Sequence, residues 1–118
     1  MACHRKVRSR ENLFRILSKT KHVRTSFTPQ ADSDLTELEI DPARKKILAS
    51  VRKALGYMEI NLRHPSLQIH EYKTLRGSDG EKVFETYAQQ NTPAAYRIFW
   101  YYGPNRNQLT IAAITPHP

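Results

Sequence analysis

The sequence has little cysteine and glycine and no long apolar segment. Cys3 is the only cysteine among 118 residues, which excludes an internal disulfide and a cysteine-rich zinc site. The four glycines form no phosphate-binding loop, and the five histidines lack the spacing of metal ligands. The longest apolar run falls far short of the roughly 20 residues that span a membrane, and no segment resembles a signal peptide. We therefore expect a cytoplasmic protein with no metal or other cofactor.

The net charge of +8 is distributed unevenly along the chain. Residues 1–24 contain eight Lys and Arg residues against one Glu, whereas the remainder contains eleven basic and ten acidic residues. The sequence thus predicts a basic N-terminal extension over residues 1–21 and a nearly neutral domain over residues 22–118. The extension either contacts nucleic acid without sequence specificity or only keeps the chain soluble, and both interpretations stay open.

Apolar periodicity predicts a strand, then helices, then four strands. His22–Thr28 alternates like a strand, Asp32–Leu38 suits a short acidic helical turn, and Asp41 with Pro42 marks the start of the main helix. That helix ends within Asn61–Pro65. The four later strands are expected over Leu67–Leu75, Lys82–Ala88, Tyr96–Tyr102 and Gln108–Ile114. Their connectors are short and rich in turn residues, so an α+β fold follows: a small antiparallel meander with helices on one face.

The strand Tyr96–Tyr102 has one arginine among aromatic and branched residues. Alternation places Arg97 with Phe99 on one face, and Ile98 with Trp100 on the other. We expect the face with Trp100 to pack on the helix, which leaves Arg97 on an open face. An arginine beside aromatic rings suits single-stranded RNA, because the guanidinium pairs with phosphate while bases stack on rings. The alternative is a cross-strand salt bridge from Arg97 to Glu85 or Glu71.

Several segments together resemble the RelE/ParE toxin superfamily, in matching order and spacing over roughly residues 22–118. In that family a helix leads through a short proline turn into strands with basic and aromatic positions, and the last strand closes near a histidine. The resemblance implies a small antiparallel sheet, with an N-terminal strand beside a four-strand meander, packed on one or two helices. The matching segments are Asn61–Leu67, Tyr72–Gly77, Val83–Glu85, Tyr96–Ile98 and His117.

The resemblance implies a toxin of a type II toxin–antitoxin system, neutralised by a cognate antitoxin. RelE-like members cleave messenger RNA on the ribosome without a metal ion, whereas ParE-like members poison DNA gyrase. Metal-free cleavage requires a base, an acid and cations around the phosphate. By family position Arg97 would bind the phosphate, His117 would be the acid or base, and Glu71 or His70 would be the base. The remaining implied RNA or phosphate contacts are Lys73, Arg76, Tyr87, Phe99 and Tyr101.

One residue and the C-terminal segment depart from the pattern of the nuclease members. Tyr87 stands where many nuclease members have an arginine, and Thr115–Pro118 lacks the terminal tyrosine or basic residue of other members. These departures favour a ParE-like toxin without enzymatic activity, or a degenerate member that binds a partner without toxicity. Whether the chain is an enzyme therefore stays open at the level of sequence.

Overall fold

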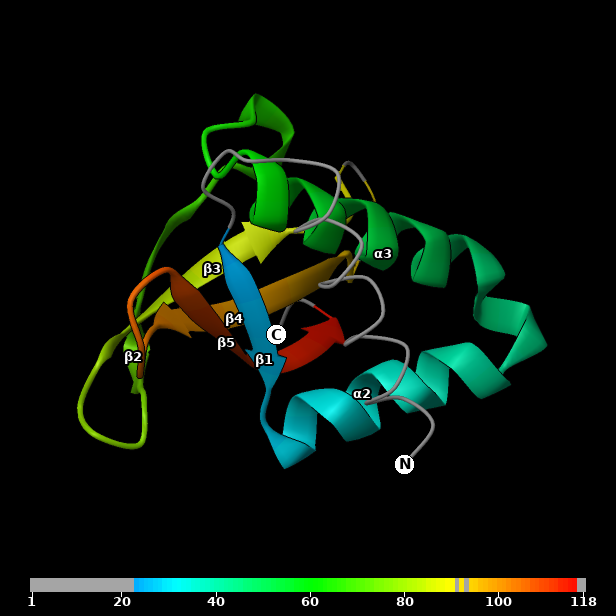
Figure 1. The fold of residues 1–118 in the computed structure, drawn as a ribbon. Helices are drawn as coiled ribbons and strands as arrows, with labels where there is room; N and C mark the ends of the chain where they lie inside the picture. Colours follow the sequence, from blue (N-terminus) through cyan, green and yellow to red (C-terminus); the bar gives the residue numbers. More distant parts are fainter. Residues whose placement is uncertain (1–22, 91, 93, 117–118) are drawn as a thin grey trace, which may run out of the picture.

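A computed structural model describes residues 23–90, 92 and 94–116 (Figure 1). The basic extension over residues 1–21 and the candidate residue His117 lie outside the described residues. Two 3-10 turns, η1 (Pro42–Arg44) and η2 (Pro65–Leu67), flank the longer of two helices. The elements in chain order are β1 (Arg24–Phe27), α2 (Pro29–Ile40), α3 (Lys45–Ile60), β2 (His70–Arg76), β3 (Lys82–Tyr87), β4 (Tyr96–Tyr102) and β5 (Gln108–Pro116).

The five strands form one sheet in the order β1-β5-β4-β3-β2. Strands β2 to β5 pair with their sequence neighbours in antiparallel orientation, which confirms the predicted meander and the α+β class. Strand β1 instead lies parallel to β5, with Ser26 opposite Thr110. Because a parallel partner cannot be reached through a tight turn, the connection from β1 to β5 runs through both helices and the other three strands.

Helix α2 and the turn η1 each begin with a side-chain cap followed by proline. Thr28 caps α2 through its side-chain oxygen, which accepts a hydrogen bond from the Ala31 amide, and Pro29 occupies the first position, where no amide donor is needed. The helix runs for twelve residues, so the short turn predicted over Asp32–Leu38 was too short. Asp41 caps η1 rather than α3, and α3 itself begins at Lys45. The predicted end of α3 before Pro65 is confirmed.

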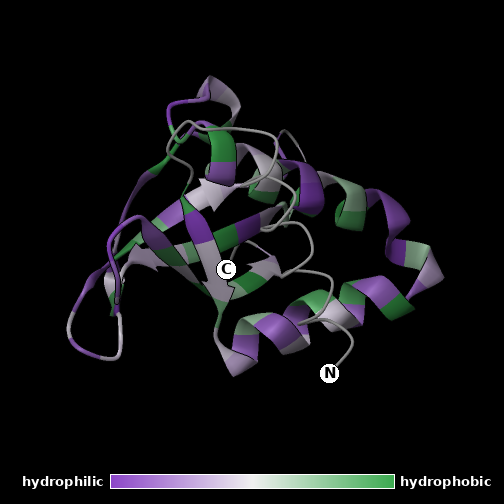
Figure 2. Cartoon of the chain, viewed as in Figure 1, coloured by the Kyte–Doolittle hydropathy of each residue, from purple (hydrophilic) through white to green (hydrophobic). Residues whose placement is uncertain are grey.

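Helices α2 and α3 pack against one side of the sheet, which we call the helix face (Figure 1). Ile98 and Trp100 are buried there, as the alternation predicts, and the indole Nε1 of Trp100 donates a 2.7 Å hydrogen bond to Thr86 Oγ1. Along both helices apolar residues alternate with polar ones, so each helix turns an apolar stripe toward the sheet (Figure 2). The buried apolar residues of α3 are Val51, Ala54, Leu55 and Met58.

The opposite side of the sheet, which we call the aromatic face, has a smaller cluster of its own. Val83, Phe99 and Tyr101 are buried there, and Tyr72 packs its ring edge-on against Phe99 with centroids 5.0 Å apart. No residue of α2 or α3 belongs to this cluster. Within the described part of the chain, no helix is long and apolar enough to cross a membrane.

Candidate functional site

Arg97 lies on the aromatic face, as predicted, but it is buried rather than open. The residue is 7% exposed. The ring of Tyr87 lies over its guanidinium, with 3.7 Å from Cζ to the ring centroid. The two residues sit opposite each other on β4 and β3, so the sheet register brings them together. The prediction of an open face is therefore wrong at Arg97, because aromatic side chains from the neighbouring strand cover it in place of a helix.

The partner of Arg97 is Glu85, one of the two carboxylates that the salt-bridge interpretation named. Arg97 Nε lies 3.5 Å from Glu85 Oε2, and the two side chains are 9% and 4% exposed. Arg97 Nη1 donates to the main-chain oxygens of Ala95, at 3.1 Å, and of Gln89, at 3.5 Å. A buried ion pair of this kind costs desolvation energy on both sides, so it depends on these additional hydrogen bonds.

His70 contacts the other oxygen of the same carboxylate. It stands opposite Glu85 in the β2–β3 register, with 2.7 Å from Nε2 to Glu85 Oε1. Its Nδ1 lies 3.0 Å from the main-chain oxygen of Gln68, a residue in the left-handed conformation (φ 46°) at the end of η2. The two ring nitrogens are therefore both engaged, one by the carboxylate and one by the main chain, and these contacts fix the orientation of the ring.

These three residues form what we call the His70–Glu85–Arg97 cluster. The Glu85 carboxylate lies at its centre, with a half-exposed imidazole on one side and a buried guanidinium on the other. The ring of Tyr87 contacts both ends, because it covers Arg97 and meets the His70 ring edge-on at 5.9 Å. The cluster thus offers solvent one group able to transfer a proton, and the charges behind it fix its orientation.

The other predicted site residues are divided between several places. Glu71 stands opposite Phe84, whose ring packs against the helix-face core, so it lies on the other side of β2 from His70. Of the two predicted bases, only His70 joins the cluster. Lys73 and Arg76 are exposed further along β2, where the pairing with β3 is irregular.

The aromatic residues predicted to contact RNA are mostly packed within the fold. Phe99 and Tyr101 are 4% and 8% exposed, so little of either ring is accessible for stacking on a base. Tyr87 is half-buried, and one of its faces is occupied by Arg97. Tyr87 covers Arg97 and Phe99 stands opposite Glu85, whereas Tyr101 packs in the apolar cluster with Val83.

Glu85 is the site residue that the sequence prediction named only as a salt-bridge alternative. The bounds of the predicted strands Lys82–Ala88 and Tyr96–Tyr102 were enough to predict the position of Glu85 beside Arg97. If Ala88, the end of one strand, is placed opposite Tyr96, the start of the next, then Glu85 falls opposite Phe99 on the face of Arg97. The structure has this register. Counting cross-strand pairs back from the connector between these two strands would therefore have identified Glu85 as a site residue.

Comparison of the chain with protein-family models and with curated proteins finds no match. Among the described residues no group of three His, Cys, Asp or Glu side chains is arranged to hold a metal ion.

Proposed function

We propose that this chain is the toxin of a type II toxin–antitoxin system, with a RelE/ParE-like fold, and that it cleaves messenger RNA on the ribosome without a metal ion. The observation that carries the proposal is the His70–Glu85–Arg97 cluster, in which a half-exposed imidazole is backed by a buried carboxylate. The exposed cations Lys73 and Arg76 follow His70 on the same strand. The meander packed on two helices agrees with the fold that the family resemblance implies.

The contacts of His70 suit a proton donor in this reaction. When the RNA 2′-oxygen attacks the adjacent phosphorus, the bond to the 5′-oxygen breaks and that oxygen needs a proton. His70, held between Glu85 and the Gln68 carbonyl, supplies it and keeps its orientation through Glu85. His117 is then the candidate base for the 2′-hydroxyl.

Arg97 acts in this scheme through Glu85 and is a positioning residue. Its guanidinium is buried beneath Tyr87, so phosphate contact falls to Lys73 and Arg76. Arg97 and His70 contact the two oxygens of the Glu85 carboxylate, so Arg97 helps to hold the group that orients the His70 ring.

The variant His70→Gln tests the proposal. Glutamine keeps an amide donor toward Glu85 but transfers no proton, so cleavage should fall by about 10² to 10⁴-fold while the fold is retained. Transcripts mapped by primer extension after induction measure the cleavage, and circular dichroism of the purified variant checks the fold. The exposed substitution Glu37→Gln on α2 serves as the control with unchanged cleavage. Undiminished cleavage by folded His70→Gln overturns the proposed role.

The burial of Arg97, Phe99 and Tyr101 favours one alternative, a ParE-like inhibitor of DNA gyrase without enzymatic activity. Their burial removes three of the RNA contacts that a nuclease of this family would use. A gyrase supercoiling assay separates the two functions: inhibition of supercoiling without transcript cleavage would replace the nuclease proposal. A chain that does neither would be a binding member of the family without toxicity.

The proposal also implies a cognate antitoxin as partner and the cytoplasm as location. A small acidic protein with a DNA-binding N-terminal domain, encoded next to this chain, is the expected antitoxin. Co-expression should suppress the growth arrest, and co-purification of the two chains would identify the pair.

A further inference from the structure

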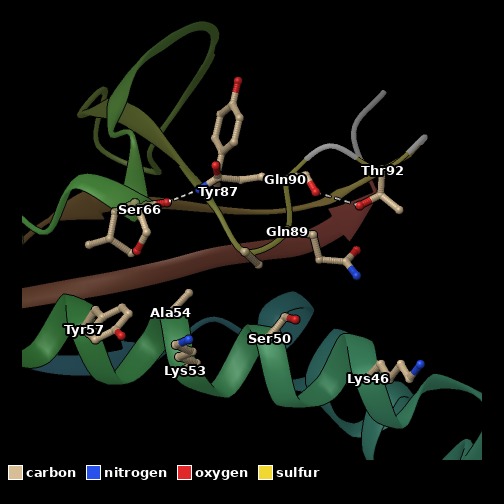
Figure 3. Close-up of a pocket in the computed structure, with 12 residues that line it drawn as sticks. Lys46, Ser50, Lys53, Ala54, Tyr57, Ser66, Tyr87, Gln89, Gln90 and Thr92 are labelled. Carbon is tan, nitrogen blue, oxygen red and sulfur yellow. Dashed lines mark hydrogen bonds between the residues drawn. The ribbon is translucent and has the colours of Figure 1, made fainter.

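An open groove of about 480 Å³ lies between α3 and the chain segment that follows β3 (Figure 3). Its size is in the range of pockets that hold small ligands. Most of the lining residues carry a polar side-chain group, and they include two lysines and no Asp or Glu. The groove is separate from the His70–Glu85–Arg97 cluster but shares Tyr87 with it. The lining residues are Lys46, Ser50, Lys53, Ala54, Tyr57, Ser66, Leu67, Tyr87, Ala88, Gln89, Gln90 and Thr92.

One wall of the groove is a single stripe of α3. Lys46, Ser50, Lys53 and Tyr57 follow each other at intervals of four, three and four residues, so they lie above one another on the same side of the helix. The two lysines are two turns apart, which is about 10.5 Å along the axis. Lys53 also lies 6.0 Å from the centre of the Tyr57 ring.

The lysines of the groove differ from the arginines nearby. Arg52 pairs with Glu39 at 3.1 Å, and Arg44 pairs with Asp41 at 3.2 Å. Neither Lys46 nor Lys53 forms an ion pair with a carboxylate anywhere in the described ranges. Two uncompensated ammonium groups along a concave surface attract an anion with charges spaced along its length.

The other wall offers amide and hydroxyl groups. Gln90 Nε2 donates a 2.7 Å hydrogen bond to the Ser66 carbonyl, which ties the segment after β3 to η2 and closes this end of the groove. Gln89 Oε1 accepts a hydrogen bond from the Tyr96 amide at 3.0 Å, so its orientation is fixed. In Figure 3 the Gln89 side chain extends toward α3, which places its amide NH₂ group in the groove.

We propose that this groove binds a short stretch of single-stranded RNA, with Lys46 and Lys53 contacting phosphates and Gln89 contacting a base. The inference rests on the proposed function, since it names the path of its substrate. Tyr87 connects the two places: its main chain lines the groove, while its ring points away from α3 and covers Arg97 (Figure 3). Gln89 connects them too, because its main-chain oxygen accepts from Arg97.

An acidic peptide is the other polyanion that two lysines could attract, and the lining argues against it. Peptide docking normally needs an apolar or aromatic anchor buried in a pocket. The apolar side chains that line the groove are Ala54, Leu67 and Ala88, and the first two are already buried in the core. Amides and hydroxyls beside cations match base edges and phosphates better.

The test measures binding by fluorescence anisotropy of a labelled 2′-O-methyl oligouridylate, with the full chain. This probe lacks the nucleophilic 2′-hydroxyl, so binding is read without cleavage, and failure of the nuclease proposal cannot mimic failure of this one. The variant Lys46→Gln/Lys53→Gln is compared with Lys45→Gln/Lys82→Gln. The control removes the same charge from exposed positions outside the groove.

The groove variant should weaken binding about tenfold and lower the slope of log affinity against log salt by about 1.4, since each lost phosphate contact removes about 0.7. The control should change affinity by less than about twofold. Equal weakening by both variants would overturn the proposal, because it would show a general effect of net charge. Binding of a labelled oligoglutamate that is lost with the groove lysines, without binding of the oligouridylate, would overturn it in favour of an acidic peptide.

Discussion

The two faces of the sheet are built on different principles. The helix face buries a continuous apolar core between β4, β5 and both helices, and its buried polar contacts are single hydrogen bonds, such as those from Trp100 to Thr86 and from Thr25 to Glu59. The aromatic face has three buried apolar residues, and beside them it buries the charges of Glu85 and Arg97, with neither α2 nor α3 packed on this cluster. Apolar burial on the helix face therefore provides most of the stability.

The ion pair behind a half-exposed histidine is the reason why chemistry is expected on the aromatic face. A buried ion pair stabilises a fold less than well-packed apolar residues of the same volume, so charges persist inside a protein at some cost. On the aromatic face the desolvation cost of the buried charges arises at the place where Glu85 orients the half-exposed His70 ring. Four changes, from the largest expected loss of stability to the smallest, examine whether the faces differ in this way.

Trp100→Ala should give the largest effect, because it removes the largest buried side chain of the helix face. The free energy of unfolding should fall by about 3 to 5 kcal/mol, as for other large aromatic residues replaced by alanine in a core. Urea denaturation followed by circular dichroism measures it. Tyr102→Ala is the control, since Tyr102 is 56% exposed on the same strand and should change stability by about 1 kcal/mol or less. Equal losses would contradict a helix face that dominates stability.

Glu85→Leu examines the aromatic face. It leaves the buried Arg97 guanidinium without its carboxylate, and the free energy of unfolding should fall by about 3 kcal/mol. The double variant Glu85→Leu/Arg97→Leu should recover most of that loss, because no buried charge then remains. A double-mutant cycle from urea denaturation gives the coupling. If the double variant is no more stable than Glu85→Leu alone, the two charges are not coupled through burial.

Thr86→Val separates packing from hydrogen bonding on the helix face. The valine nearly conserves the shape, but the buried indole N–H of Trp100 loses its acceptor, at a cost of about 2 kcal/mol. Thr86→Ser keeps the hydroxyl and should lose less. The comparison is made by thermal unfolding of the two variants. The hydrogen bond would be unimportant if serine proved the more damaging change.

His70→Gln should have the smallest effect on stability. The His70 side chain is 48% exposed, and pairs with an exposed partner typically contribute less than about 1 kcal/mol. Its unfolding curve should nearly overlay that of the unchanged chain, although RNA cleavage is expected to be lost. A large destabilisation by His70→Gln would instead make this residue a structural cap of Glu85.

Local patterns were sufficient to predict most of the elements. Asp41 and Pro42 marked a cap, the apolar spacing predicted α3, and turn residues between alternating segments predicted the meander. Alternation also assigned Trp100 and Arg97 to opposite faces. Each of these features depends on residues close together in the chain, so periodicity and turn chemistry determine them.

Other features depended on contacts between distant segments, and only the tertiary structure decided them. The parallel pairing of β1 with β5 joins residues more than 80 positions apart. Burial of Arg97 required Tyr87 from β3 and an acceptor at Gln89, and the choice of Glu85 over Glu71 required the register of three strands. The sequence by itself determined that an arginine would share a face with aromatic rings. Whether that face was open to solvent was decided by the neighbouring strands, because burial is set by every side chain that folds around a residue.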